Sequence, residues 1–467
     1  MYDWLSDYDV YPRVVPAGRR VSVTVRPLGR GASFDGSAEY RFEVLPMLYR
    51  PTVLVSDCGV RHSVPAVHTD GGLVLTDVFD EEQEHSLSLY RGDELIVRFS
   101  VYSLKEDLYA RTPLLGDLHT HSTFSDGSQP PEIVAAECRR RGYDFMAVTD
   151  HHNYAGSLAA RAAYRNVRTD LNILPGEEVH LPGNDIHIVS FGGVHSVNFR
   201  VESNLRYARD HGIVPGTDPQ DRWCALPGYT MPETVTEERY RAETEALAKE
   251  VRVPDGVERF PFLSCLWICG RIREADGLSI FAHPYWIKES AYQVPAAMTD
   301  ALFEACPFDC FEVLGGEKYL NQNEFQTWHY VRQLTGGHGM PVVGNSDSHN
   351  MLNGEDSAYA ATVVFAERNE RRALIGAVRE GYSVAVDLIG KEKRLVGDIR
   401  LVRYTRYLMD ACFPAVKEIC GEEGRLMAAY VSGTDPEAGE RLNALSGRTA
   451  RLRERLLGHA APAEEHK

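Results

Sequence analysis

The chain has 467 residues, 43% of them hydrophobic and 25% charged, an ordinary globular composition that excludes disordered, collagenous and coiled-coil proteins. Its 50 Lys and Arg against 67 Asp and Glu give a formal charge of −17, so it lacks the net basic face of a general nucleic-acid coat or an anionic-membrane binder. Only a short nucleic-acid end in a metal-lined pocket stays compatible with this charge, because bound cations reverse the local sign.

Apolar runs and cysteine usage give an expectation for the compartment. No stretch of 18 apolar residues occurs, and the N-terminus has neither a basic nor an apolar leader segment, so the sequence predicts no membrane span and no secretory signal. The nine cysteines are scattered and odd in number, which predicts reduced thiols in the cytoplasm.

Residues 1–113 are predicted to form an N-terminal β-rich domain. Val21–Val25 and Tyr40–Val44 alternate apolar and polar residues, and Gly, Asp and Pro separate the short apolar runs at the spacing of strands and turns. We expect a small antiparallel, β-sandwich-like domain. It could bind substrate, pack against a second subunit or support the rest of the chain.

The sequence pattern changes at residue 114. Over residues 114–388, predicted buried strands alternate with helical segments, which is the pattern of parallel β/α units. Helices are predicted over 130–141 and 371–379. About seven such units over this length favour an α/β fold of the barrel type rather than an open sheet. The predicted strands are Leu115–His119, Phe145–Thr149, Ile173–Leu174, Ile186–Ser190, Leu278–Ala282, Cys310–Leu314, Met340–Gly344, Thr362–Phe365 and Tyr382–Val386.

Two further segments complete the predicted organisation. A polar insertion over 198–260, with a charged helix at Glu237–Val251, interrupts the β/α series, and insertions of this length usually cap or cover a site. From 389 to 467 the chain is predicted to form a C-terminal helical extension, mainly over Ile399–Cys420 and Pro436–Leu457.

Histidines and carboxylates gather at the ends of these predicted strands, where barrel folds place their chemistry. His119 and His121 are two residues apart, as are Asp347 and His349, and side chains at this spacing lie on one face of an extended segment. One such His is more often a hydrogen-bonding residue, but the complete set is far more specific. The candidate metal ligands are His119, His121, Asp126, His151, Glu178, His187, His283, Asp347 and His349.

Ligation by His, Asp and Glu without thiolate suits Zn, Mn or Fe. Nine ligands exceed the need of one ion, so the set predicts two or three divalent cations that share a bridging carboxylate or hydroxide. Such a hydroxide forms near neutral pH and is a natural nucleophile. The sequence therefore predicts a metal-dependent hydrolase.

Five motifs resemble those of the PHP (polymerase and histidinol phosphatase) superfamily: GDLHTHSTFSDG at 116–127, VTDH at 148–151, PGEE at 175–178, FAHP at 281–284 and GNSDSH at 344–349. The resemblance covers about residues 114–388. It implies a distorted (β/α)7 TIM-like barrel with a trinuclear metal site formed by the nine residues above. It also implies a phosphoesterase acting on histidinol phosphate, nucleotides or nucleic-acid ends.

Some assignments within this resemblance stay open. The family pattern Pro-Gly-x-Glu favours Glu178 over Glu177 as the bridging carboxylate, and His180 and His195 compete with His187 as a ligand. The β-rich leader resembles the layout of the carbaryl-hydrolase-like branch, whose named members cleave carbamate esters.

Other residues near the motifs are weaker candidates for catalysis. His152 is either an acid near the leaving group or a packing residue, whereas Asp150 and Asp117 are placed to orient imidazoles. Glu312 is a candidate to line the site from its strand. Lys288, Arg271 and Arg273 are candidates to bind substrate phosphate.

Three functions are compatible with these features. The first is a phosphoesterase in which a metal-bridging hydroxide attacks a small phosphate ester. The second is hydrolysis of a carboxylic or carbamate ester on the same ions, and the third is a non-catalytic metal-binding module. An oligomer is compatible with the sequence, and nucleic acid beyond short ends is not expected to be a partner.

Overall fold

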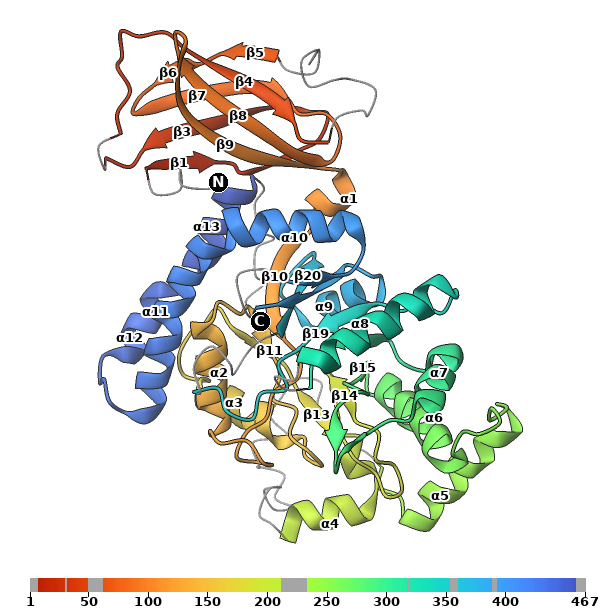
Figure 1. The fold of residues 1–467 in the computed structure, drawn as a ribbon. Helices are drawn as coiled ribbons and strands as arrows, with labels where there is room; N and C mark the ends of the chain where they lie inside the picture. Colours follow the sequence, from red (N-terminus) through yellow and green to blue (C-terminus); the bar gives the residue numbers. More distant parts are fainter. Residues whose placement is uncertain are drawn as a thin grey trace. The chain divides into compact units, whose positions relative to one another are not determined.

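The computed structural model describes residues 7–29, 32–48, 62–210, 233–316, 320–352, 360–388 and 393–458 (Figure 1). It divides the chain into two compact units. The first contains residues 1–112, 399–419 and 447–467, and the second contains 113–398 and 420–446. The three-part division stays a prediction, and the C-terminal helices are shared between the two units. Within the described ranges, we find no helix with the length and apolarity that a membrane crossing requires.

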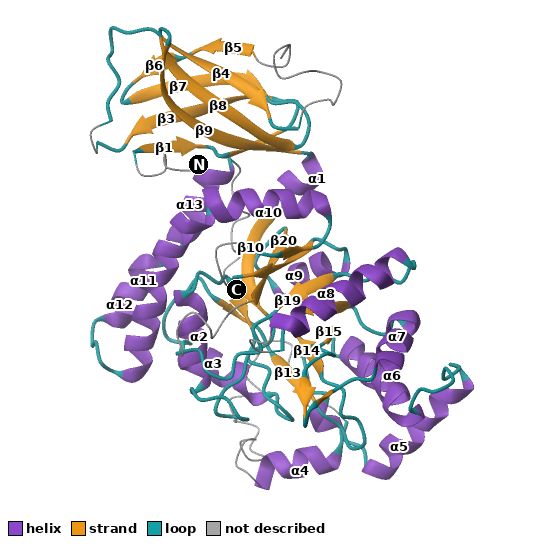
Figure 2. Ribbon diagram, in the orientation of Figure 1, coloured by secondary structure: helices purple, strands orange, loops and turns teal. Residues whose placement is uncertain are grey.

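The first unit is built on two β-sheets (Figure 2). Neighbouring strands in these two sheets are antiparallel, except that β2 is parallel to β9. Alternate residues of β4 and β8 are buried. The apolar ones among them pack with buried residues of the other strands in one apolar cluster. One sheet has the order β1 (Tyr8–Tyr11), β3 (Arg20–Pro27), β7 (Gly72–Val78), β6 (Val67–Thr69), and the other β2 (Val14–Pro16), β9 (Glu94–Leu104), β8 (Gln83–Arg91), β4 (Tyr40–Pro46), β5 (His62–Pro65).

Helices close the first unit. The short helix α1 (Glu106–Tyr109) follows β9, and α10 (Ile399–Ala411) and α13 (Arg448–Leu457) come from the C-terminal part of the chain. Tyr404 and Tyr407 of α10 are almost fully buried, and their rings lie 5.1 and 5.4 Å from that of Tyr102. This aromatic contact anchors α10 to β9.

The second unit has a mixed α/β fold with two sheets. The first sheet has the order β12 (Asn172–Ile173), β11 (Phe145–Met146), β10 (Thr112–Asp117), β20 (Ala360–Ala366), β21 (Ser383–Asp387), β22 (Leu395–Val396). The second has the order β13 (Gly176–Val179), β14 (Ile188–Phe191), β15 (Leu278–Phe281), β18 (Cys310–Leu314), β19 (Val342–Gly344). In the described residues these ladders stay two open sheets and do not close into one barrel.

Strand direction departs from the all-parallel prediction. β10, β11 and β12 are parallel, as are β15, β18 and β19, but β14 is antiparallel to both β13 and β15, and β21 is antiparallel to β20 and β22. The loop between β13 and β14 is too short for a parallel crossover, which needs a dozen or more residues. A hairpin is therefore the connection that this loop allows.

The ends of the two sheets meet through single bridges beyond the regular strands. Thr120 pairs with Ser348, and His151 pairs with Glu178. The Thr149 amide donates to Thr120 at 2.7 Å, and the Glu178 amide donates to Thr149 at 3.0 Å. These pairings bring together the strand ends that carry the predicted ligands.

Helices surround the sheets of the second unit. The predicted helices over 130–141 and 371–379 appear as α2 (Pro131–Arg140) and α9 (Arg371–Arg379). The others are α3 (Ala155–Ala163), α4 (Glu202–Asp210), α5 (Glu237–Ala246), α6 (Arg259–Glu274), α7 (Ala296–Ala305), α8 (Leu320–Thr335) and α12 (Ala438–Leu445). Helix α11 (Phe413–Ser432) begins in the first unit and ends in the second. A small hairpin, β16 (Ile287–Lys288) and β17 (Ala291–Tyr292), follows β15.

The predicted insertion contributes α4, α5 and the start of α6, whereas its residues 211–232 lie outside the described part of the chain. Thr236 caps α5 by accepting a hydrogen bond from the Arg239 amide. This helix ends at Ala246 and continues as a 3-10 turn over Leu247–Lys249, so it is shorter than predicted.

Candidate metal centre

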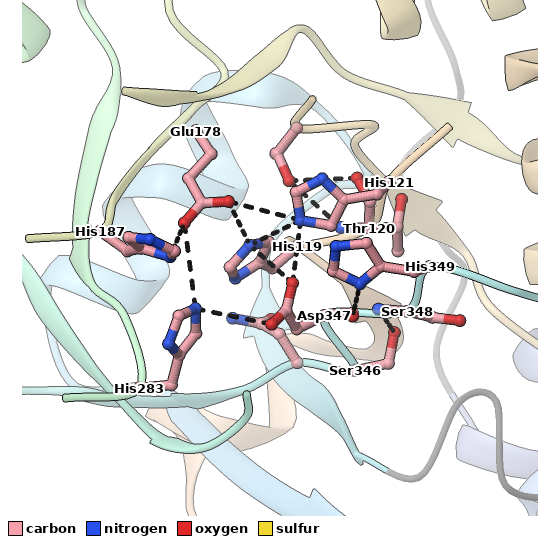
Figure 3. Close-up of polar contacts among 12 residues, drawn as sticks. His119, Thr120, His121, Glu178, His187, His283, Ser346, Asp347, Ser348 and His349 are labelled. Atoms are coloured by element: carbon pink, nitrogen blue, oxygen red, sulfur yellow. Dashed lines mark hydrogen bonds and ion pairs between the residues drawn. The ribbon is translucent and has the colours of Figure 1, made fainter. Parts of the chain in front are cut away.

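Glu178 lies at the centre of a cluster of imidazoles (Figure 3). It is fully buried on β13. Its Oε2 lies 2.9 Å from His151 Nδ1, 3.3 Å from His119 Nε2 and 3.4 Å from His121 Nε2. Its Oε1 lies 2.6 Å from His187 Nδ1 and 3.9 Å from His283 Nε2. One carboxylate therefore faces two groups of nitrogen donors at once.

Asp347 forms a second carboxylate link between the same imidazoles. Its Oδ1 lies 2.8 Å from His121 Nε2 and 3.2 Å from His119 Nε2, and its Oδ2 lies 3.5 Å from His283 Nε2. The residue has a φ of 51°, and its amide donates to the His119 carbonyl at 2.9 Å. This left-handed backbone turns the carboxylate towards the cluster immediately after β19.

Asp126 joins a third group at the edge of the cluster. It lies 3.3 Å from His349 Nε2 and 3.5 Å from His151 Nε2. The predicted turn brings it there: the Gly127 amide donates to Ser122 at 2.9 Å, and a Cβ at Gly127 would lie only 2.6 Å from the His121 backbone. Glycine is therefore required for this turn.

His187 immediately precedes β14 rather than following the end of a strand. Because β14 is antiparallel to β15, its first residues lie beside the last residues of β15, and the Ala282 amide donates to His187 at 3.4 Å. His187 and His283 are thus neighbours, with ring centroids 5.0 Å apart.

Burial and charge set the protonation of the cluster. Burial opposes protonation of His119, but Asp347, Glu312 and Glu178 outweigh it and raise the pKa of His119 well above its usual value. Burial lowers the pKa of His121 to about 3. Burial also disfavours the ionised form of Glu178, but His187, His151 and His119 hold its pKa well below the usual value. Ionised carboxylates thus lie beside imidazoles of both charge states.

The donor set fits divalent cations. Glu178 Oε1, His187 Nδ1 and both ring nitrogens of His283 are buried without a hydrogen-bond partner, and the Nε2 atoms of His119 and His121 face each other at 3.2 Å. Such burial is costly unless a cation compensates it. The residues form five groups, and within each group the donor atoms lie within 4.8 Å of one another: His121, Asp126, His151, His349; His119, His121, Glu178, Asp347; His119, His283, Glu312; His151, Glu178, His180; and Glu178, His187, His283.

The structure brings all nine predicted ligands into these groups, which also contain Glu312, and adds His180. Its Nε2 lies 2.8 Å from His151 Nδ1 and 3.6 Å from Glu178 Oε1. The sequence carried a signal for it, because Glu178 and His180 are two residues apart. Glu177 points the other way and accepts a hydrogen bond from Ser196 Oγ at 2.6 Å.

Two of the three catalytic candidates lie behind the cluster. Asp150 is fully buried and accepts hydrogen bonds from the Ser122 amide and hydroxyl, both at 2.7 Å. Glu312 is also fully buried, with Oε2 at 3.0 Å from His119 Nδ1 and 2.8 Å from Asn345 Nδ2. Glu312 therefore contacts a ligand imidazole directly, whereas Asp150, which was predicted to orient an imidazole, holds the Ser122 backbone that follows His121. Asp117 accepts hydrogen bonds from the backbone amides of His119 and Ser346, so it also holds backbone next to ligands.

His152, the third candidate, lines a pocket of about 620 Å³ beside the cluster. Lys288 lines the same pocket. Arg271 and Arg273 are engaged elsewhere on α6, with Glu274 and with the Pro307 carbonyl. The other lining residues are Thr123, Phe124, Ser125, Asp126, His151, His180, His187, Tyr207 and Trp286. Tyr207 belongs to α4, so the predicted insertion contributes to this pocket.

Comparisons with known proteins agree with the motifs. The family described as PHP domain matches residues 117–222. A 3',5'-nucleoside bisphosphate phosphatase from Chromobacterium violaceum is 27% identical over 50% of this chain and 86% of its own length. A phosphoribosyl 1,2-cyclic phosphate 1,2-diphosphodiesterase from Eggerthella lenta is 36% identical over 17% of this chain and 31% of its own length.

Other similarities are partial. The chain spans less than a third of the length of several curated relatives, including 9% of a DNA polymerase/3'-5' exonuclease PolX from Bacillus subtilis. Among solved structures, a two-domain protein from Bacteroides vulgatus, containing a predicted PHP-like metal-dependent phosphoesterase, is 15% identical. That match covers 59% of this chain and 65% of the other, with a TM-score of 0.36. The sequence match to the PHP domain covers residues 117–222, which contain six of the nine predicted ligands.

Proposed function

We propose that this protein is a metal-dependent phosphoesterase that hydrolyses a small phosphate ester in the pocket beside the ligand cluster. The observation that carries the proposal is the convergence of overlapping donor groups, several with buried atoms that make no hydrogen bond, at the wall of an open pocket. The PHP match and the names of the phosphatase and phosphodiesterase relatives support the same reaction class.

Two or three divalent cations, Zn, Mn or Fe, are proposed to occupy the cluster. The candidate ligand groups are His121, Asp126, His151 and His349; His119, His121, Glu178 and Asp347; and Glu178, His187 and His283. Cations held there would lower the pKa of water and neutralise charge on phosphoryl oxygens. Glu178 is the proposed bridging carboxylate, because its two oxygens face different groups.

The remaining residues would bind and orient. Lys288 is proposed to attract the phosphate, since its side chain is half exposed at the pocket wall. His152 is proposed to donate a proton to the leaving group, because it lines the pocket without belonging to a ligand group. Asp150 and Glu312 are reassigned from catalytic to positioning residues, because both are fully buried behind ligands.

The architecture is part of the same proposal. We propose that the two sheets of the second unit together correspond to the distorted (β/α)7 barrel of the PHP superfamily. The bridges Thr120–Ser348 and His151–Glu178 support this, because they join the sheets at the level of the cluster. We likewise propose that the two sheets of the first unit form a β-sandwich around their shared apolar cluster. The cytoplasmic location stays a prediction from the cysteine pattern.

Phosphate is favoured over a carboxylic or carbamate ester because a cation, Lys288, reaches the pocket. A non-catalytic module is disfavoured by the complete donor set. The test is hydrolysis of p-nitrophenyl phosphate and of an aryl carbamate by metal-free protein reloaded with Zn, Mn or Fe.

A matched pair of variants sharpens this test. Asp347→Asn keeps the side-chain shape but removes a charge that faces three imidazoles, so it should abolish phosphatase activity and lower bound metal. His62→Gln, on strand β5 in the first unit, is the control and should change neither. Full activity in Asp347→Asn would discard the proposal, and carbamate cleavage without phosphate cleavage would replace it with the ester reaction.

A further inference from the structure

The pocket beside the cluster has an aromatic lining. Phe124 comes from the loop after β10, Tyr207 from α4 and Trp286 from the loop after β15. The Trp286 ring lies 5.7 Å from that of His187 at an interplanar angle of 31°, and its amide donates to the His283 carbonyl at 3.0 Å. The indole is thereby held close to two predicted ligands, so a group bound to the cations would lie near its face.

Tyr207 brings a second ring to the same pocket. Its ring lies 6.1 Å from that of His152, and half of the residue's surface is exposed. Flat aromatic groups pack against such rings in offset or edge-to-face arrangements. The pocket therefore offers contact surface to a planar organic group beyond the cluster.

Positive charge in this pocket is sparse. Among the described residues that line it and the adjoining hollow at Gly183 and Asn184, Lys288 is the single Lys or Arg. Its Nζ lies 3.9 Å from Asp185 Oδ2, and Asp126 adds another carboxylate. Phosphate away from a metal is held by Arg, Lys or backbone amides. A second phosphate in this pocket would lie near the carboxylates of Asp126 and Asp185, and Lys288 would be the one lysine of the described lining to offset their repulsion.

We propose that this pocket selects phosphate esters that carry one phosphate and an aromatic ring on the alcohol side. The inference rests on the proposed phosphoesterase function and narrows its substrate class. The phosphate would lie at the cluster near Lys288, and the ring would lie against Trp286 and Tyr207. This separates the chain from a relative named for a nucleoside bisphosphate.

The direct test compares binding of two non-hydrolysable probes, benzylphosphonate and (cyclohexylmethyl)phosphonate, to the metal-loaded protein by calorimetry. They share size and charge and differ in aromaticity. The aromatic probe should bind ~3- to 10-fold more tightly, the range that an aromatic pair adds beyond burial. Equal affinity for the two probes would overturn the proposal.

Variants assign the preference to the named rings. Trp286→Leu and Tyr207→Leu should each reduce the ratio of the two affinities towards one while leaving metal content unchanged. Trp328→Leu is the matched control, because this exposed tryptophan lies on α8 and does not line the described pocket. A ratio that persists in both pocket variants would overturn the assignment.

Hydrolysis kinetics test the second half of the proposal, that the preferred ester carries one phosphate. Benzyl phosphate and a benzene carrying two phosphooxymethyl groups contain the same reacting P–O bond, so the second phosphate should not lower KM. A KM for the bisphosphate more than tenfold below that for benzyl phosphate would overturn the preference for one phosphate. If the phosphonates bind with the expected ratio but no phosphate ester is cleaved, the proposed function fails while the pocket inference stands. If phosphate esters are cleaved but neither probe is preferred, the proposed function stands and the pocket inference fails.

Discussion

Replacing Glu312 by Gln tests the role of the buried carboxylate behind His119. Glu312 Oε2 accepts from His119 Nδ1 at 3.0 Å and from Asn345 Nδ2 at 2.8 Å. The Asn345 Oδ1 in turn accepts from the Leu118 amide at 3.0 Å, so the carboxylate is itself fixed in position. With its proton held on Nδ1, His119 presents Nε2 to Glu178 and Asp347. Glutamine keeps the shape and one acceptor oxygen but removes the charge.

The size of the effect follows from these contacts. A hydrogen bond to a charged group contributes about 1.5–3 kcal/mol, and most of that depends on the charge. At about 1.4 kcal/mol per tenfold change, this corresponds to a loss of ~10- to 100-fold. Substitutions of carboxylates that orient metal-binding histidines cost a similar ~10- to 100-fold in metal affinity or activity. We therefore expect Glu312→Gln to weaken Zn affinity within this range and to lower kcat/KM for an aryl phosphate.

Competition with a fluorescent chelator measures Zn affinity on metal-free protein, and urea unfolding checks that the variant is folded. Glu137→Gln is the control, because Glu137 is a buried glutamate of α2 that pairs with Arg140 and Arg141 and belongs to none of the donor groups. It should leave Zn affinity unchanged. A Glu312→Gln protein with the Zn affinity of the wild type would refute the positioning role of Glu312.

Two further predictions concern stability away from the cluster. Burial lowers the pKa of His85 to about 4 from its usual 6.5, so below pH 6.5 the unfolded chain binds a proton that the folded chain does not. Acidification to pH 4.5 should therefore lower the free energy of unfolding by about 3 kcal/mol. His85→Gln should remove this part of the pH dependence of the unfolding free energy, measured by urea titration. The same slope in both proteins would contradict the shift. Arg139→Met leaves Glu423, whose Oε2 lies 2.8 Å from Arg139 Nε, buried without its partner and should destabilise the protein by about 3–5 kcal/mol. The double variant with Glu423→Leu should recover most of that loss, and a single variant as stable as wild type would contradict the prediction.

Much of the local structure was accessible from the sequence because it depends on periodicity. The helix over 371–379 was predicted at its observed bounds, and the strand Cys310–Leu314 likewise, since each has an apolar pattern flanked by clear end signals. The convergence of His119 and His121 with Glu178 could also be anticipated, because strand ends meet at one edge of a sheet.

Strand direction and side-chain facing could not be obtained in this way. Periodicity does not distinguish parallel from antiparallel strands, so the antiparallel β14, and with it the reason why His187 lies beside His283, required the structure. Glu312 lies on a strand whose residues are all buried, so alternation could not indicate whether it faces the pocket or the back of His119. The same argument explains why His180 was left as an alternative to His187 although both join the cluster.

Metal analysis in a crystal tests the central claim most directly. Anomalous scattering from crystals of the full chain grown with Zn should give two or three peaks, each ~2.0–2.2 Å from nitrogen or oxygen donors of the cluster. One of these peaks should lie between His119, His121 and Asp347, and Glu178 should ligate two ions. Crystals with no peak among these side chains, at a Zn concentration that saturates the protein in solution, would contradict the account.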